Sequence, residues 1–228
     1  TTRTSIRGFN ATPLNKDEMK EMLTLLEQAM DEGAAGVSLG LQYEPGIFAT
    51  GEELREIARL VKKKNKLLTV HLRAYSSLAP GYPMSTPKIL LDYVSPFDGY
   101  EPHNLLAINE LLNIARETGV RLQISHLIFV GTRTFKTCED ALNRIDRAIK
   151  QGVDVKFDTY SYHCGQSIIN VILPAWFLAK APQAYNDKKI LSKLKSELGL
   201  IQRFLGFGTK DIQITYANSE ELNQYNGM

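Results

Sequence analysis

The sequence of 228 residues lacks most of the patterns that identify a function directly. Its cysteines, Cys138 and Cys164, do not have the close spacing of a zinc-binding pair. Its net charge of +2 is too small to indicate binding to nucleic acid or to an anionic membrane surface. No apolar run approaches the roughly 20 residues that a membrane helix needs, and the chain has no Walker loop and no G-x-S-x-G elbow. We therefore expect a globular protein of the reducing cytoplasm that binds neither nucleic acid nor membranes.

What the sequence does have is a regular alternation of amphipathic and short apolar segments. Helical spacing of apolar residues occurs within 15–33, 50–61, 105–119 and 137–152. Each is followed by an apolar run typical of a buried strand, and these runs are 36–41, 67–71, 121–126 and 153–160. Strands that alternate with helices pair in parallel, because each helix provides the crossover connection. We therefore predict an α/β fold with about four parallel βα units.

This alternation ends near Pro174, which divides the chain into two parts. Residues 1–173 are predicted to form one parallel α/β unit. Residues 174–228 are predicted to be a mostly helical insertion, or the start of the subsequent barrel segment, with a strand at 212–215. The connection 73–103 is unusually long and rich in proline and tyrosine. Long loops in compact domains usually have a function, so we expect a lid over the site, with a partner surface as the alternative.

Two histidines stand at the ends of neighbouring predicted strands. His71 closes the run 67–71, and His126 closes the run 121–126. The carboxyl ends of parallel strands meet at the face where an α/β barrel carries its chemistry. A lone histidine in such a place is more often a hydrogen-bonded core residue, but two at equivalent strand ends favour metal ligation. A bound zinc ion lowers the pKa of water to about 7 and polarises a carbonyl group, and amide hydrolysis needs both effects.

Other polar residues near the strand ends have simpler explanations. His163 and Cys164 are adjacent on an extended segment, where neighbouring side chains point to opposite faces, so they are poorly placed to share a proton. Asp158 lies within a predicted strand and is expected to be a hydrogen-bonded carboxylate. His103 lies just before a helix and is expected to be a cap or a surface residue. Arg73, by contrast, follows the first strand-terminal histidine and is a candidate to bind a substrate carboxylate through its two-pronged guanidinium.

Four blocks of sequence carry a resemblance to a known family. The blocks are 36–46, 70–73, 123–126 and 158–162. In order and approximate spacing they resemble the middle of the D-aminoacylase, or N-acyl-D-amino-acid deacylase, family of the amidohydrolase superfamily, and the resemblance extends over about 12–176. It implies a (β/α)8 TIM-type barrel that holds one or two divalent metals, usually zinc, so residues 1–173 are expected to be a partial metal-dependent hydrolase barrel. On this basis His71 and His126 are the metal ligands from strands five and six.

The same resemblance implies which residues meet the substrate and which parts of the site are missing. It suggests Tyr43 and Tyr162 as substrate-binding tyrosines of the pocket. The family's H-x-H motif and its acid–base aspartate do not occur here, so we expect a central fragment that lacks the remaining ligands and is inactive by itself. The family's lysine two residues after the strand-six histidine is replaced by Ile128, which leaves the acyl group and the amino acid open.

These observations predict a metal-dependent hydrolase of N-acyl-D-amino acids, which cleaves the C–N amide bond of a small-molecule substrate with metal-activated water. Two alternatives remain open. One is another amide or cyclic-amide hydrolase of the same superfamily, and the other is a non-catalytic barrel fragment that binds a ligand or a partner. Zinc is expected in the full-length enzyme and not in the fragment, because two ligands seldom hold the ion. Unpaired strands at the edges of a partial barrel also predict self-association.

Overall fold

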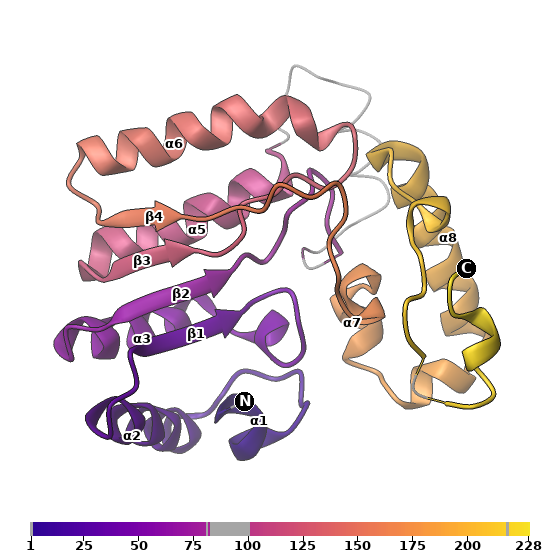
Figure 1. Cartoon of the computed structure of the whole chain (residues 1–228). Helices are drawn as coiled ribbons and strands as arrows, with labels where there is room; N and C mark the ends of the chain where they lie inside the picture. Colours follow the sequence, from indigo (N-terminus) through magenta and orange to yellow (C-terminus); the bar gives the residue numbers. More distant parts are fainter. Residues whose placement is uncertain (1, 81, 83–100, 218) are drawn as a thin grey trace.

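The computed structural model of the chain describes residues 2–80, 82, 101–217 and 219–228 (Figure 1). Its centre is a four-stranded parallel sheet in which the strands pair in their order along the chain. The strands are β1 (Gly36–Gly40), β2 (Leu67–His71), β3 (Arg121–Ile124) and β4 (Val155–Phe157). The predicted α/β fold with four parallel strands is thus confirmed.

One long helix precedes each strand, and the last three of these helices connect successive strands. These helices are α2 (Lys16–Asp31), α3 (Gly51–Lys63), α5 (His103–Thr118) and α6 (Cys138–Lys150). Neighbouring helices contact each other in the same order as the strands, and Figure 1 shows the stack from α2 to α6. The first two begin at the capping boxes that the sequence indicates, Asn15 with Glu18 and Thr50 with Glu53. Local sequence therefore sets where α2 and α3 start.

The main core lies between the sheet and this layer of helices. The strands contribute alternate residues, namely Val37, Leu68, Val70, Leu122, Ile124 and Val155. The helices contribute their apolar faces, including Leu54, Ile57, Val61, Ile108, Leu111 and Ile145. Burial of one such side chain contributes about 1.5–3 kcal/mol. The opposite face of the sheet carries the polar residues Ser38, Thr69, Gln123 and Lys156, none of which is buried. His71 lies on this same face, because it is two residues after Thr69 in β2 and side chains alternate along a strand.

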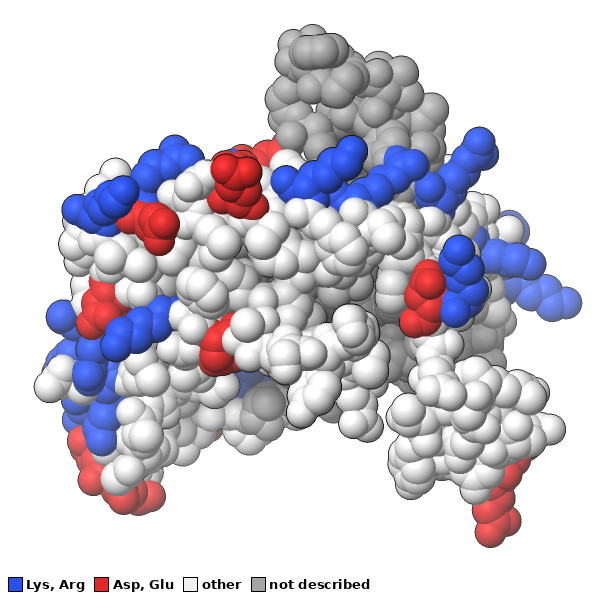
Figure 2. Space-filling model, turned by 45° about the horizontal axis from the view of Figure 1, so that its top comes forward, with Lys and Arg blue, Asp and Glu red and all other residues white. Residues whose placement is uncertain are grey.

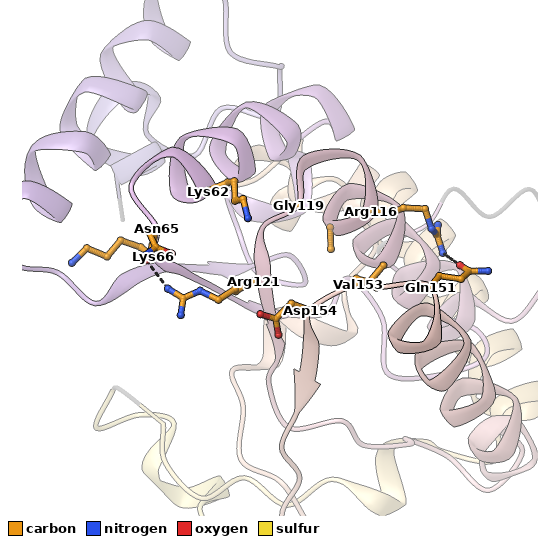
Figure 3. Close-up of a pocket in the computed structure, with 11 residues that line it drawn as sticks. Lys62, Asn65, Lys66, Arg116, Gly119, Arg121, Gln151, Val153 and Asp154 are labelled. Carbon is orange, nitrogen blue, oxygen red and sulfur yellow. Dashed lines mark hydrogen bonds between the residues drawn. The ribbon is translucent and has the colours of Figure 1, made fainter.

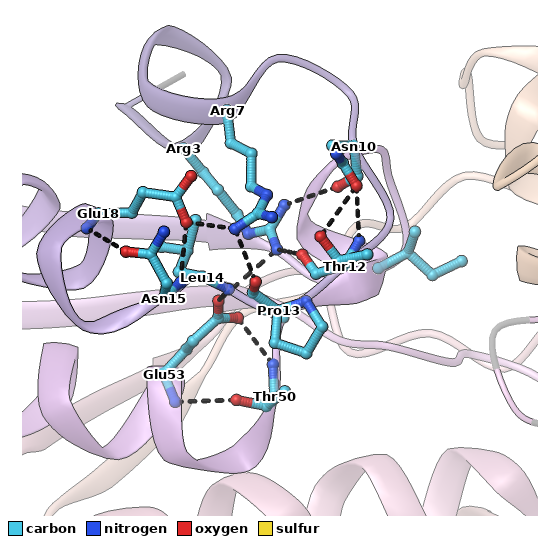
Figure 4. A network of polar contacts seen from close by, with 12 residues as sticks. Arg3, Arg7, Asn10, Thr12, Pro13, Leu14, Asn15, Glu18, Thr50 and Glu53 are labelled. Carbon is cyan, nitrogen blue, oxygen red and sulfur yellow. Dashed lines mark hydrogen bonds and ion pairs between the residues drawn. The ribbon is translucent and has the colours of Figure 1, made fainter.

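A network of polar contacts anchors the N-terminal segment to the start of α3 (Figure 4). Helix α1 (Thr2–Arg7) packs on α2, and its Arg3 is only 8% exposed. The Arg3 guanidinium donates to the Thr12 carbonyl at 3.0 Å and lies 3.6 Å from the Glu53 carboxylate. Glu53 also accepts from the backbone N–H groups of Leu14 and Thr50, each at 2.8 Å. This buried carboxylate therefore ties three segments together at the amino end of α3.

The C-terminal part is mostly helical, as predicted. Helices α7 (Ala175–Leu178) and α8 (Lys188–Leu205) pack around a small cluster that contains Phe177 and Leu194. Helix α8 also contacts the segment after β2, where Ile201 and Leu205 meet Leu78. The short 3₁₀ helices are η1 (Gly46–Phe48), η2 (Thr134–Thr137), η3 (Ile169–Ile172), η4 (Gln183–Asn186), η5 (Thr209–Asp211) and η6 (Asn223–Tyr225).

Three expectations differ from the structure or lie outside it. The strand predicted at 212–215 is wrong, because Ile214 is in an irregular segment and exchanges backbone hydrogen bonds with the last two residues of the chain. His103 is not a surface residue, since it is 8% exposed and its Nδ1 accepts a hydrogen bond from the Ala79 N–H at 2.8 Å. The predicted lid at 73–103 lies largely outside the described residues, which omit 83–100.

Charged side chains of both signs are interspersed on the face shown in Figure 2. Among the described residues, charged side chains form pairs between neighbouring helices at the surface, such as Lys64 with Asp31 at 2.8 Å and Arg55 with Glu117 at 2.6 Å. Exposed pairs of this kind contribute about 0–1 kcal/mol, so they are a minor part of the stability. Within the ranges that the structure describes, no helix is both long and apolar enough to cross a membrane.

Candidate metal-binding site

The structure brings the two strand-terminal histidines into direct contact. His71 is the last residue of β2, and His126 lies two residues after the end of β3. The Nδ1 atom of His71 is 3.0 Å from the Nε2 atom of His126. Their rings are nearly perpendicular, with an interplanar angle of 80°. Two side chains that are distant in sequence thus present ring nitrogens to one point at the carboxyl edge of the sheet.

The backbone around His126 is held in an uncommon conformation. Its φ of 37° lies in the left-handed region, which costs a residue with a Cβ roughly 1–2 kcal/mol. The carboxylate of Asp158, which follows β4, stabilises this conformation by accepting the His126 backbone N–H at 2.6 Å and the Gln123 side-chain N–H at 2.7 Å. The backbone of Leu127 adds a bond to the Asp158 carbonyl at 2.7 Å. Asp158 is thus the hydrogen-bonded carboxylate that the sequence suggests, and it orients His126.

His71 lies in a partly buried and largely aromatic environment. The Tyr43 ring is tilted over it at a centroid distance of 4.4 Å, and the Tyr75 ring meets it edge-on at 4.7 Å. Burial, and after it the electrostatic influence of the neighbouring His126, lowers the pKa of His71 to about 3. Its imidazole is therefore neutral near pH 7. A neutral imidazole has a free lone pair, which is the form that binds metals.

The pair fits part of a zinc site. Two nitrogens bound to one tetrahedral zinc ion lie about 3.3 Å apart, because each Zn–N bond is about 2.0–2.1 Å long. The separation of 3.0 Å between the two histidines is close to this value. The nitrogen of His126 that faces His71 is Nε2, and its other ring nitrogen, Nδ1, is buried without a hydrogen-bond partner in the part of the chain that the structure describes. Over those same residues no group of three or more His, Cys, Asp or Glu side chains is placed to hold a metal, so any further ligands lie elsewhere.

The three residues predicted to bind substrate are placed differently. Tyr43 lies beside the histidines, with its hydroxyl 3.4 Å from His71 Nδ1. Tyr162 is 76% exposed and contacts Tyr160, at 6.4 Å between ring centroids, and not the histidines. Arg73 is 8% exposed and forms a two-pronged ion pair with Glu110. These contacts favour a structural role for Arg73, and the substrate contacts of all three residues stay predictions.

Two residues of the site escaped the sequence analysis. Gln42, just after β1, lies with its Oε1 atom 2.9 Å from His71 Nε2. The Tyr75 hydroxyl accepts the Leu72 N–H and donates to the Ser125 carbonyl, both at 2.9 Å, so it joins the loops that follow β2 and β3. The signal that could have found Gln42 is its place directly after a strand, since it occupies the same edge of the sheet as His71.

A separate cavity of about 340 Å³ lies at the opposite, amino-terminal edge of the sheet (Figure 3). Its lining includes four basic residues, Lys62, Lys66, Arg116 and Arg121. Helices α3, α5 and α6 end around it, and basic side chains at the ends of helices compensate the negative pole of the helix dipole. The basic character of this cavity therefore has a structural explanation.

The parallel βα sheet presents two converging strand-terminal histidines, an arrangement that fits part of a metal site. No protein-family model matches the chain. It is 30% identical over 165 residues to N-acyl-D-glutamate deacylase of Alcaligenes xylosoxydans xylosoxydans, and this match covers 72% of the chain and 28% of that protein. It is 28% identical over 153 residues to D-aminoacylase of the same organism, and this match covers 67% of the chain and 26% of that relative.

A solved structure agrees with these relatives. The chain is similar to N-acyl-D-glutamate deacylase from Bordetella bronchiseptica, complexed with zinc and a phosphonate inhibitor, with a TM-score of 0.57 and 29% identity. This match covers 71% of our chain and 29% of that one. The chain is therefore a relative of the D-aminoacylases and N-acyl-D-glutamate deacylases of the amidohydrolase superfamily, as the sequence blocks indicate. It spans less than a third of the length of the curated relatives it matches.

Proposed function

We propose that the protein hydrolyses the amide bond of N-acyl-D-amino acids and uses one or two bound divalent metal ions for this, with zinc as the metal. The observation that carries the proposal is the convergence of His71 Nδ1 and His126 Nε2, 3.0 Å apart, at the carboxyl edge of a parallel sheet. The kinship with deacylases, one of them solved with zinc, supports the reaction class. A zinc ion would supply the Lewis acidity that activates water and polarises the acyl carbonyl.

The residues of this chain would have defined parts in that reaction. His71 and His126 would hold the metal through the two nitrogens that face each other. Asp158 holds the backbone of His126, and so would keep its ring in place for the metal. Tyr43 lines the site with its hydroxyl 3.4 Å from His71 Nδ1, within reach of a substrate polar group. The rings of Tyr43 and Tyr75 pack against the His71 ring and would shield it from water.

The test is metal analysis and a hydrolysis assay on the whole protein. We expect bound zinc, and faster release of free amino acid from N-acyl-D- than from N-acyl-L-amino acids. His71→Ala and His126→Ala should each lower zinc content and reduce kcat/KM at least 100-fold, because each removes a ligand. His163→Ala is the matched control, since this histidine is exposed, and it should behave like the wild type. Full turnover after removal of the metal by a chelator would refute the proposal, and so would bound metal without any turnover.

A further inference from the structure

The amide group of Gln42 has an orientation that its two neighbours determine. Its Nε2 atom lies 3.5 Å from the Val171 carbonyl, and its Oε1 atom lies 2.9 Å from His71 Nε2. A carbonyl oxygen only accepts hydrogen bonds, so the NH₂ end of the amide must face Val171. The oxygen end must then face His71. Because this oxygen can only accept, His71 Nε2 must carry the proton.

The protonation of Nε2 determines the state of the other ring nitrogen. A neutral imidazole has one protonated nitrogen and one lone pair, so Nδ1 of His71 is the nitrogen with the lone pair. This atom is 3.0 Å from His126 Nε2 and 3.4 Å from the Tyr43 hydroxyl. The lone pair of His71 therefore points to the position where the two histidines converge.

The backbone places Gln42 firmly in this position. Leu41 continues the β1–β2 ladder by donating its N–H to the His71 carbonyl at 3.0 Å, so the residue next to Gln42 is bonded to the very residue that Gln42 orients. The following turn returns closely on the strand, since a Cβ atom at Gly46 would lie 2.0 Å from the Gly40 carbonyl oxygen. The turn and the ladder thus restrict where the Gln42 side chain can reach.

We infer that Gln42 is a positioning residue, which holds His71 in the Nε2–H tautomer and presents its Nδ1 lone pair to the metal. The metal half of this inference rests on the proposed function, whereas the tautomer half does not. Metal-binding histidines commonly donate their second N–H group to a carbonyl or carboxylate oxygen. Loss of that acceptor typically costs 10- to 100-fold in metal affinity.

The test compares three variants of the whole protein. Gln42→Glu keeps an acceptor oxygen for His71, and Gln42→Met keeps the length of the side chain but removes the acceptor. Gln28→Met is the matched control, because Gln28 is exposed on α2 and its side chain donates a hydrogen bond to nearby Glu32. Two quantities are measured: the zinc dissociation constant, by competition with a chromophoric chelator, and the ¹⁵N shifts of the His71 ring in the metal-free protein, which report its tautomer.

We expect Gln42→Met to weaken zinc binding 10- to 100-fold and to give a mixture of His71 tautomers. Gln42→Glu and Gln28→Met should retain the Nε2–H tautomer and bind zinc within a few-fold of the wild type. The inference is overturned if Gln42→Met keeps wild-type affinity and tautomer, or if Gln42→Glu loses as much affinity as Gln42→Met. Absence of zinc binding by the wild type would refute the proposed function. A wild-type His71 protonated on Nδ1 would refute the role of Gln42 alone.

Discussion

Replacement of Arg73 by methionine separates a structural role of this residue from a role in substrate binding. The Arg73 guanidinium makes two hydrogen bonds of 3.0 Å to the Glu110 carboxylate. It also donates to the carbonyls of Ile47 at 2.9 Å and of Ala49 at 3.1 Å. These contacts join the segment after β2 to α5 and to the turn before α3. Arg73→Met leaves the carboxylate and both carbonyls without these donors.

The magnitude follows from burial. Breaking a buried ion pair by removing one partner costs about 3–5 kcal/mol. The side chain of Arg73 is 9% exposed but that of Glu110 is 23% exposed, which lets water solvate part of the orphaned carboxylate. We therefore expect Arg73→Met to lower the free energy of unfolding by about 3 kcal/mol, at the lower end of the range. The double variant Arg73→Met, Glu110→Met leaves no charge unpaired. Its decrease in the free energy of unfolding should therefore be smaller than the sum of the two single decreases, by at least about 1 kcal/mol.

The assay is urea unfolding followed by circular dichroism, with KM for an N-acyl-D-amino acid measured in parallel. A purely structural Arg73 predicts a lower unfolding midpoint, a positive coupling with Glu110 and an unchanged KM for the folded fraction. The reasoning fails if Arg73→Met unfolds at the wild-type midpoint while KM rises more than 10-fold. That result would place the guanidinium on the substrate carboxylate instead.

Further predictions concern the other polar anchors and the sheet edges. Asp158→Ala should weaken zinc binding about 10-fold in a chelator competition, because it frees the backbone of His126, and Asp158→Asn should weaken it less because an acceptor oxygen remains. Glu53→Ala should lower the free energy of unfolding by about 3 kcal/mol, since it removes the capping box of α3 and the carboxylate that pairs with buried Arg3. Its control is Glu52→Ala at the neighbouring exposed residue, which should change this free energy by less than about 0.5 kcal/mol. The 228-residue chain by itself should sediment as oligomers, because β1 and β4 each have one neighbour among the described strands, and a monodisperse monomer would contradict this.

The sequence was sufficient for features that depend on near neighbours. The capping boxes at Asn15 and Thr50 predicted two helix starts, and apolar runs between helical patterns predicted four parallel strands. Prediction was weaker towards the carboxyl end of the chain. The strand expected at 153–160 is only Val155–Phe157, and the strand expected at 212–215 is absent.

The candidate site shows the same division. That His71 and His126 lie close together follows from sequence, because the ends of adjacent parallel strands must meet at one edge. The partners of these residues did not follow, since Gln42 is 29 residues from His71 and Glu110 is 37 residues from Arg73. Such contacts depend on how the loops and α5 pack above the strands. Sequence alone therefore determined which two imidazole rings approach each other. The tertiary structure decided which of their nitrogens face each other, and that the Arg73 guanidinium is paired with Glu110, because both depend on the direction of individual side chains.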